Sequence, residues 1–553
     1  MQIDIYALLA GNPLILVFVV VGLGLLVGRI KIGPTALGST IGVLAVGLVF
    51  GHFGLSIHEM VGTFGFALFI FAVGLQAGPG FFSAFRADGV RYVTMSLLVA
   101  LTGIGLALVF TRFLDFDPGI SAGILAGALT STPSLAGAQD AFVSGIGNIG
   151  DLTAEQARRN VSIGYAMTYL GGTAGVIALV RWLPKLTGID LQQEAQALER
   201  ERGLTPKRRS SGPGALRVIR AYEVAEGGKT LAQARHDLEL PIVPLRIKRG
   251  KEFVEVSPDQ EVKKGDVISV FAGLDVHQRL LDGLGTEVLD PVLLDYAVDS
   301  CEIVVLSESA EGRPLSEQGL VEKHGCFATA VTRSGIEMPF SENIVLHRGD
   351  RLHVTGVKAG LHSAADAIGY IEEEVDETDL TTFSFGIAAG AGVGLIAIKF
   401  GGISIGLGMA GGLLLVGILI GFASSINPTF GRVPEPARYL LMELGLMLFM
   451  AKVGLSAGGG IVEALLNAGP AIIACGLLMT LLPACLVYVV GRRVMKMNPA
   501  LLLGSVTGAM TSTSALSVIN EAARSPVPAL GYAGTYTIAN VLLTFAGTVV
   551  AMF

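Results

Sequence analysis

Three consecutive hydroxyl side chains interrupt an apolar, glycine-rich stretch at two places in the sequence. Residues 127–135 read Gly-Ala-Leu-Thr-Ser-Thr-Pro-Ser-Leu, and residues 508–516 read Gly-Ala-Met-Thr-Ser-Thr-Ser-Ala-Leu. Hydroxyl side chains offer the backbone an alternative to helical hydrogen bonds, and Pro133 disfavours helical geometry at Thr132. We therefore expect each stretch to be a helix that breaks in the middle. The chemistry that such a break offers is binding, by hydroxyls and freed backbone amides.

A broken helix is tolerated inside a membrane only where protein or a water-filled cavity covers the freed backbone groups. Transporters place their substrates at such breaks, and the N-terminus of a half-helix attracts carboxylates. The alternative is that the hydroxyls only hold helices together, but two copies in matching places favour a site. The candidate substrate-binding residues are Thr130, Ser131, Thr132, Pro133, Thr511, Ser512 and Thr513.

Two glycine clusters and one lysine extend the candidate site. Gly74 and Gly78 match Gly454 and Gly458 at a constant offset. Glycines let a helix backbone approach either a ligand or a neighbouring helix, and both interpretations stay open. Lys452 lies well inside an apolar run, where charges are costly and mark function. We favour pairing with an anionic substrate over snorkelling to the membrane interface.

Carboxylates follow both broken segments, at Asp140 and at Glu521. We expect them to be solvated loop residues, with helix capping or coupling as the alternative. The sequence has no His-x-x-x-His pair and no Gly-x-x-x-x-Gly-Lys-Ser/Thr loop, and its four cysteines lack metal-ligand spacing. We therefore expect no enzymatic activity, no metal, no cofactor and no use of ATP.

The distribution of charge indicates a membrane protein with a soluble insert. The chain has 553 residues, of which 51% are hydrophobic and 15% charged, whereas about 25% charged residues is usual. Residues 12–182 and 380–552 are nearly uncharged over long runs, while 186–378 has a soluble composition. The net charge of −7 gives no indication of a nucleic-acid partner.

Each apolar region is long enough for about five crossings of a ~30 Å hydrocarbon core. Loop basic residues favour external N- and C-termini and a cytoplasmic segment 186–378. Arg158 and Arg159 fall on the outer side in this arrangement, which counts against it. The expected spans are near 13–28, 35–51, 62–79, 93–111 and 161–182, then 382–400, 403–422, 437–457, 470–490 and 530–552. The broken segments are 119–143 and 499–519.

The two membrane regions match along their length, and two homologous halves with an odd number of crossings must be inverted relative to each other. The fold class is thus a polytopic α-helical membrane protein with two inverted-repeat halves. Each half has about five transmembrane helices plus one re-entrant broken segment. The insert carries a second repeat, with Gly265-Asp266 matching Gly349-Asp350 between short alternating strands, which predicts two small α+β modules. The expected boundaries are 1–185 for the first repeat, 186–211 for a linker, 212–288 and 296–378 for the modules, and 380–553 for the second repeat.

This arrangement resembles the aspartate–alanine exchanger family, and more closely its bacterial members with a duplicated membrane region. The duplicated Gly-Ala-Leu/Met-Thr-Ser-Thr and two modules similar to TrkA-C domains (the RCK C-terminal type) carry the resemblance, which covers essentially the whole chain. It implies a multi-pass carrier in the bacterial inner membrane that exchanges amino acids or dicarboxylates. It also implies membrane lipid as a partner, a small ligand or ion at the TrkA-C domains, and a homodimer.

Two other classes of protein compete with the carrier. The TrkA-C modules suggest an ion channel or K⁺ transporter that they gate, but no Thr-Val-Gly-Tyr-Gly filter is present. A membrane sensor that transports nothing is the third hypothesis.

Overall fold

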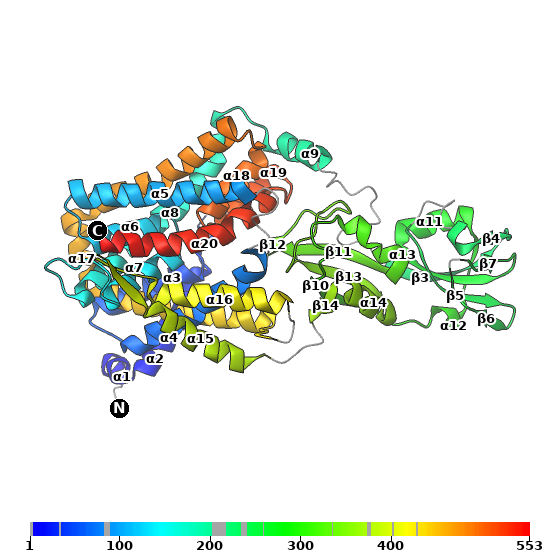
Figure 1. Cartoon of the computed structure of the whole chain (residues 1–553), viewed down its shortest axis with the longest axis horizontal. Helices are drawn as coiled ribbons and strands as arrows, with labels where there is room; N and C mark the ends of the chain where they lie inside the picture. Colours follow the sequence, from blue (N-terminus) through cyan, green and yellow to red (C-terminus); the bar gives the residue numbers. More distant parts are fainter. Residues whose placement is uncertain are drawn as a thin grey trace. The chain divides into compact units, whose positions relative to one another are not determined.

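The structure is a computed structural model, and it forms two compact units, Met1–Gln196 with Glu377–Phe553, and Ala197–Asp376 (Figure 1). The first is the membrane unit and the second is the insert. The residues that the structure describes are 4–32, 35–81, 89–201, 217–233, 241–257, 259–333, 336–372, 378–400, 403–426 and 430–553.

The two halves of the membrane unit share a short hairpin between their first two long helices and one broken segment. They differ in that the first half starts with an additional short helix and has two helices where the second half has one long helix. The first half contains α1 (Ile5–Gly11), α2 (Pro13–Gly28), β1 (Lys31–Ile32), β2 (Thr35–Ala36), α3 (Ser39–His52), α4 (Glu59–Phe81), α5 (Gly89–Phe113), α6 (Pro118–Ala128), α7 (Thr132–Val143) and α8 (Ala154–Leu186). The second half contains α15 (Leu380–Gly394), β15 (Ala397–Phe400), β16 (Ile403–Gly406), α16 (Gly408–Ile426), α17 (Glu435–Val489), a π-helical turn (Val490–Val494), α18 (Pro499–Ala509), α19 (Thr513–Ala523) and α20 (Pro528–Met552).

Among the described residues, five helices are long and apolar enough to cross a membrane, or six if the bent pair α1–α2 is one span. The chain is therefore a multi-pass membrane protein. The expected spans at 437–457 and 470–490 both lie within α17, which forms one continuous helix of 55 residues. The intervening Glu-Ala-Leu-Leu favours helix. At 1.5 Å per residue 55 residues extend about 80 Å, more than twice the ~30 Å that one crossing needs.

Glycines bring helices of opposite halves into close contact. Helix α4 packs on α16, and α17 packs on α3. A Cβ atom added to Gly74 would lie 2.9 Å from the Cα of Gly417, and one added to Gly454 would lie 2.9 Å from the Cα of Gly47. The two contacts are equivalent under exchange of the halves, and helices of the two halves intermingle in Figure 1. The membrane unit is thus one body built from two interlocked halves.

The insert consists of two modules with the same antiparallel sheet, in the orders β6-β5-β8-β3-β9 and β12-β11-β13-β10-β14. The first contains β3 (Arg217–Val224), β4 (Lys229–Thr230), β5 (Val243–Arg249), β6 (Glu252–Val254), β7 (Glu261–Val262), β8 (Val267–Gly273), α11 (Leu274–Gly283), β9 (Gly285–Val288) and α12 (Pro291–Leu294). The second contains β10 (Val298–Val305), η3 (Leu315–Gln318), α13 (Leu320–His324), β11 (Cys326–Arg333), β12 (Ile336–Glu337), β13 (Arg351–Val357), α14 (Lys358–Ile368) and β14 (Gly369–Ile371). The expected linker 186–211 contains α9 (Leu191–Glu201), and its residues 202–211 lie outside the described residues.

The Gly-Asp repeat of the insert has a structural role. In each module the glycine adopts a positive φ, of 83° and 84°, which turns the chain into the next strand. Arg249 donates to both carboxylate oxygens of Asp266, at 2.9 and 2.8 Å, and lowers the pKa of that carboxyl. Arg333 holds Asp350 in the same way, at 2.8 and 2.7 Å. Each module is thus closed by one bidentate ion pair beneath its turn.

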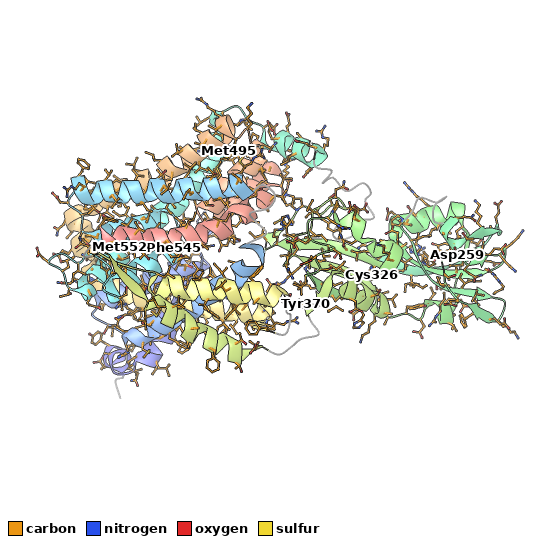
Figure 2. The ribbon with its side chains drawn as sticks, viewed as in Figure 1. Asp259, Cys326, Tyr370, Met495, Phe545 and Met552 are labelled. Carbon is orange, nitrogen blue, oxygen red and sulfur yellow. The ribbon has the colours of Figure 1, made fainter. Side chains whose placement is uncertain are left out.

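The insert also holds a buried thiol, labelled in Figure 2. Cys326 lies at the start of β11, and burial raises its pKa to about 12. All four cysteines are free. Because the thiolate is the reactive form, the raised pKa and the burial of Cys326 both disfavour its reaction at neutral pH.

Candidate substrate site at the two helix breaks

Both Thr-Ser-Thr stretches break their helices, at Thr130 between α6 and α7 and at Thr511 between α18 and α19. These threonines adopt the left-handed backbone conformation, with φ of 52° and 53°. A β-branched residue rarely adopts it, and such strain costs about 1–3 kcal/mol and gathers at functional sites. The matching outliers therefore support a function for both breaks.

The break lies two residues earlier than Pro133 suggested. We expected the proline to force Thr132 out of helical geometry, but α7 begins at Thr132 and contains the proline in its first turn. The reason is that proline is well tolerated there, where its missing N–H would have no helical partner. Ser131 is the N-cap instead.

The two breaks meet at the centre of the membrane unit. The hydroxyl of Thr130 donates to the carbonyl oxygen of Met510 at 2.9 Å, and the hydroxyl of Thr511 donates to the carbonyl oxygen of Thr130 at 3.2 Å. We call residues 129–134 the first tip and residues 510–515 the second tip. The two tips, far apart in sequence, are thus hydrogen-bonded to each other.

A tyrosine from the following helix completes each tip. The hydroxyl of Thr132 is 3.2 Å from that of Tyr165 on α8, and the hydroxyl of Thr513 is 2.9 Å from that of Tyr532 on α20. The sequence analysis did not include either tyrosine among the candidates. The sequence does contain a signal for them, because Gly164-Tyr165 in the first half matches Gly531-Tyr532 in the second half.

The helix N-termini at the two tips differ in their capping. The side chain of Ser131 accepts a hydrogen bond from the amide of Ser134 at 3.3 Å, which caps α7. Ser512 occupies the same position before α19, but its side chain makes no capping hydrogen bond to the helix. The first amides of a helix have no intrahelical partner, so the second tip presents donors for an anion.

The two tips also differ in exposure. Thr130, Ser131 and Thr132 are buried, whereas Thr513 is exposed. The exposed face of α19 continues through Ser514 and Ser517, and is therefore polar. Polar side chains in a membrane region face a bundle interior or a water-filled cavity. The second tip is thus the accessible one in this conformation.

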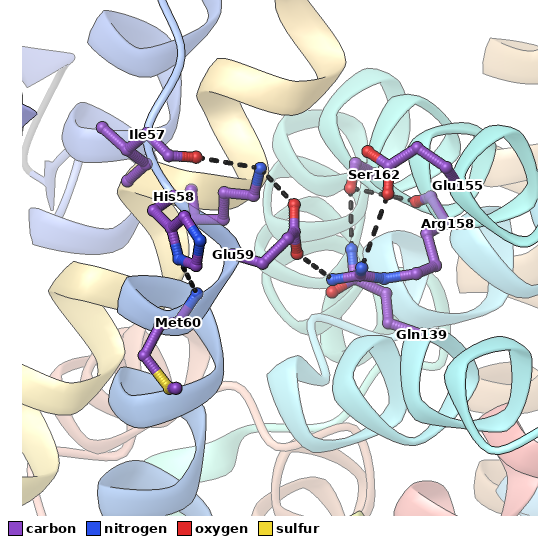
Figure 3. Close-up of polar contacts among 9 residues, drawn as sticks. Ile57, His58, Glu59, Met60, Gln139, Glu155, Arg158 and Ser162 are labelled. Carbon is purple, nitrogen blue, oxygen red and sulfur yellow. Dashed lines mark hydrogen bonds and ion pairs between the residues drawn. The ribbon is translucent and has the colours of Figure 1, made fainter.

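Lys452 contacts protein carboxylate. Its Nζ is 2.5 Å from one carboxylate oxygen of Glu59 and donates to the carbonyl oxygen of Ile57 at 3.4 Å. The other oxygen of Glu59 is 2.8 Å from the guanidinium of Arg158, which also pairs with Glu155 at 3.6 Å (Figure 3). The lysine therefore joins α17 to the start of α4. A direct role in substrate binding stays a prediction.

Arg158, which counts against the expected orientation together with Arg159, is part of this cluster. Its charge is balanced by Glu59 and Glu155, and Figure 3 shows Gln139 and Ser162 beside it. The side chain of Gln139 donates to Ser162 at 2.7 Å, and Ser162 donates to the carbonyl oxygen of Arg158 at 3.2 Å.

The glycine clusters lie where helices cross. Gly78 and Gly458 follow the pattern of Gly74 and Gly454, since an added Cβ atom would lie 2.7 Å from the backbone of Gly421 or Gly51 respectively. The structure gives all four glycines a packing role, which the sequence had left open beside ligand binding.

Asp140 was expected in a solvated loop, and this was wrong. The side chain is buried, and one carboxylate oxygen accepts a hydrogen bond from the amide of Ala410 at 3.1 Å, at the N-terminus of α16. It is therefore a helix cap across the two halves, which sequence spacing cannot reveal because the partner lies in the other half. Glu521 is exposed, as expected, but it lies in α19 and not in a loop.

The sequence model of a predicted permease membrane region matches residues 16–185 and again residues 382–552, which together exceed half of the chain. The TrkA-C domain model matches residues 301–369, the second module of the insert. No solved structure matches the chain. A duplicated permease region with an inserted TrkA-C domain indicates a membrane transporter. The chain belongs to the aspartate–alanine exchanger family.

Proposed function

We propose that the protein is a secondary active transporter that exchanges amino acids or dicarboxylates by alternating access between the two tips. The observation that carries this proposal is an asymmetry. Two equivalent tips from inverted halves bond to each other, yet only the second is exposed. A carrier whose site is open to one side of the membrane has one exposed tip and one buried tip. If the two halves exchanged conformations, the first tip would become exposed and the site would open to the other side.

The second tip offers groups suited to a carboxylate. The amides at the start of α19 supply hydrogen-bond donors and the positive end of the helix dipole. Thr513 and Tyr532 add hydroxyls beside them. A hydrogen bond to a charged group contributes about 1.5–3 kcal/mol. Two or three such bonds are enough for selective binding of a small acid.

We place the protein in the bacterial inner membrane with the insert, residues 186–378, in the cytoplasm. The exposed second tip then opens to the cytoplasm, because Arg492 and Arg493 precede α18 on that side. In this proposal the two modules regulate transport by binding a small ligand or ion. The protein works as a homodimer, surrounded by lipid.

Counterflow in proteoliposomes tests the proposal. Purified protein would be reconstituted with one unlabelled acid inside, and uptake of its isotope measured over a panel of amino and dicarboxylic acids. A carrier accumulates isotope transiently, a channel dissipates the gradient, and a sensor does neither. Absence of counterflow for every acid in the panel, from folded protein, would contradict exchange of these substrates.

A further inference from the structure

The carboxylate of Asp140 connects the first tip to a helix of the other half. It lies in α7, and it accepts from the amide of Ala410 in the first turn of α16. The contact is close, because a Cβ atom added to Gly408 would lie 2.3 Å from the same carboxylate oxygen. A carboxylate is stabilised at a helix N-terminus by free amides and the helix dipole. This contact holds α7 against α16.

The inverted repeat contains a second carboxylate and a second helix N-terminus that are equivalent to Asp140 and the start of α16. Glu521 follows Thr513 at the spacing at which Asp140 follows Thr132. Helix α3 corresponds to α16 and starts in the same way, since Gly38 has a φ of 91° and Gly408 has a φ of 64°. The N-terminus of α3 has no side-chain cap on its amides, although the hydroxyl of Ser39 donates to the carboxylate of Glu443 on α17 at 3.2 Å, and Glu521 is exposed. One carboxylate is thus docked, and its equivalent is exposed in a half whose equivalent helix is uncapped.

The docked carboxylate belongs to the buried tip, and the exposed carboxylate belongs to the exposed tip. Asp140 and Thr132 are both buried, while Glu521 and Thr513 are both exposed. Docking therefore correlates with closure. Gln139, the neighbour of Asp140 in α7, donates to Ser162 on α8 at 2.7 Å, and Ser162 donates to the carbonyl oxygen of Arg158 at 3.2 Å. These hydrogen bonds also hold α7, against α8.

We propose that Asp140 and Glu521 are alternating latches of the transport cycle. In the conformation seen, Asp140 caps α16 and keeps the first tip closed. In the opposite conformation Glu521 caps α3 at Ser39 and Thr40 and closes the second tip, while Asp140 leaves α16 and the first tip opens. This inference rests on the proposed function, because it assigns the two carboxylates to the two ends of one alternating cycle.

Substitution of Asp140 tests the first latch. A carboxylate at a partly buried helix N-terminus can shift an equilibrium by up to about 30-fold. In membranes, Asp140→Ala should therefore increase labelling of a Thr132→Cys reporter by an external maleimide several-fold, and decrease cytoplasmic labelling of a Thr513→Cys reporter. Asp151→Ala, which removes an exposed carboxylate from the loop after α7, should leave both rates unchanged. Equal rates for Asp140→Ala and Asp151→Ala in folded protein would overturn the latch.

Paired cysteines test directly whether each latch position reaches its helix N-terminus. The native cysteines are first replaced by serine. The first pair, Asp140→Cys with Ala410→Cys, should cross-link in the conformation seen. The second pair, Glu521→Cys with Thr40→Cys, should cross-link only when the protein reaches the opposite conformation. The control pair, Glu521→Cys with His52→Cys at the far end of α3, should not cross-link.

Cross-linking of the second pair should expose the first tip to external reagent, and cross-linking of the first pair should prevent this. If the second pair cross-links no faster than the control pair, the reciprocal latch is wrong. These readouts need no transported substrate. If both pairs cross-link as expected but no counterflow is seen, only the proposed function is contradicted. If counterflow is seen but the second pair does not cross-link, only the latches are contradicted.

Discussion

Thr130 and Thr511 hold each other across the boundary between the two halves, both in the left-handed conformation. The hydroxyl of Thr511 donates to the carbonyl oxygen of Thr130 at 3.2 Å, and the hydroxyl of Thr130 donates to Met510 at 2.9 Å. Each strained backbone is thus supported by the other tip. The two strained residues are therefore parts of one site, and the predictions below concern that site and its supports.

Thr132→Val and Thr513→Val should each weaken substrate binding by about 10- to 100-fold, because valine keeps the shape and removes one hydrogen bond to a charged group. Each threonine faces a tyrosine hydroxyl, and Tyr532→Phe should have a similar effect to Thr513→Val. Binding would be measured by isothermal titration or by substrate protection of labelling. Ser517→Ala, one turn further along α19, is the control and should bind normally. Normal affinity in both valine variants would remove the tips from the site.

Lys452→Met should lower stability by about 0.5–1.5 kcal/mol, because the lysine binds Glu59 and Ile57. If this structural role is its only one, substrate affinity should stay within about twofold. Glu59→Gln should reproduce the effect on stability. Thermal unfolding in detergent and substrate titration would be measured on the same preparations. A loss of affinity of about 10-fold or more, without loss of stability, would instead make Lys452 a substrate ligand.

Gly454→Ala should destabilise the membrane unit by roughly 1–3 kcal/mol, the usual cost of overpacking. The added methyl group would lie 2.7 Å from the carbonyl oxygen of Leu44, so α17 and α3 would have to separate. Gly459→Ala is a matched control five residues along the same helix, because its added Cβ atom meets nothing within 4 Å. Comparable melting temperatures for the two variants would show that the glycine contact is unimportant.

The second module of the insert, which the TrkA-C model matches, should lose stability in mild acid. Burial, with a smaller contribution from Arg333, lowers the pKa of His347 from 6.5 to about 4. The unfolded chain then binds more protons than the folded one between pH 6.5 and 4, so stability falls as pH falls through this window. We expect a loss of about 1–2 kcal/mol between pH 7 and 5. Hydrogen exchange of β13 in the full-length protein would measure it, and His347→Gln should remove most of the pH dependence.

The sequence was sufficient for features that repeat. Two copies of Thr-Ser-Thr at one spacing predicted both helix breaks, and two Gly-Asp turns predicted both small modules. The sequence was not sufficient to predict which helices of the two membrane halves contact each other. The docking of Asp140 on α16 and the pairing of Lys452 with Glu59 depend on which helices meet, and no local pattern records that. The continuous helix α17 was missed because two apolar runs separated by glycines look the same whether or not the chain between them is helical.

The crossed glycine contacts also constrain biogenesis. Gly74 of the first half packs on Gly417 of the second, and Gly47 packs on Gly454, so these faces of α3 and α4 have no partner until α16 and α17 are made. The insert is synthesised between these events, and at 5–20 residues per second this takes roughly ten seconds or more. The newly inserted first half must wait in the lipid bilayer for that time, with its glycine faces open to lipid or to chaperones of membrane insertion.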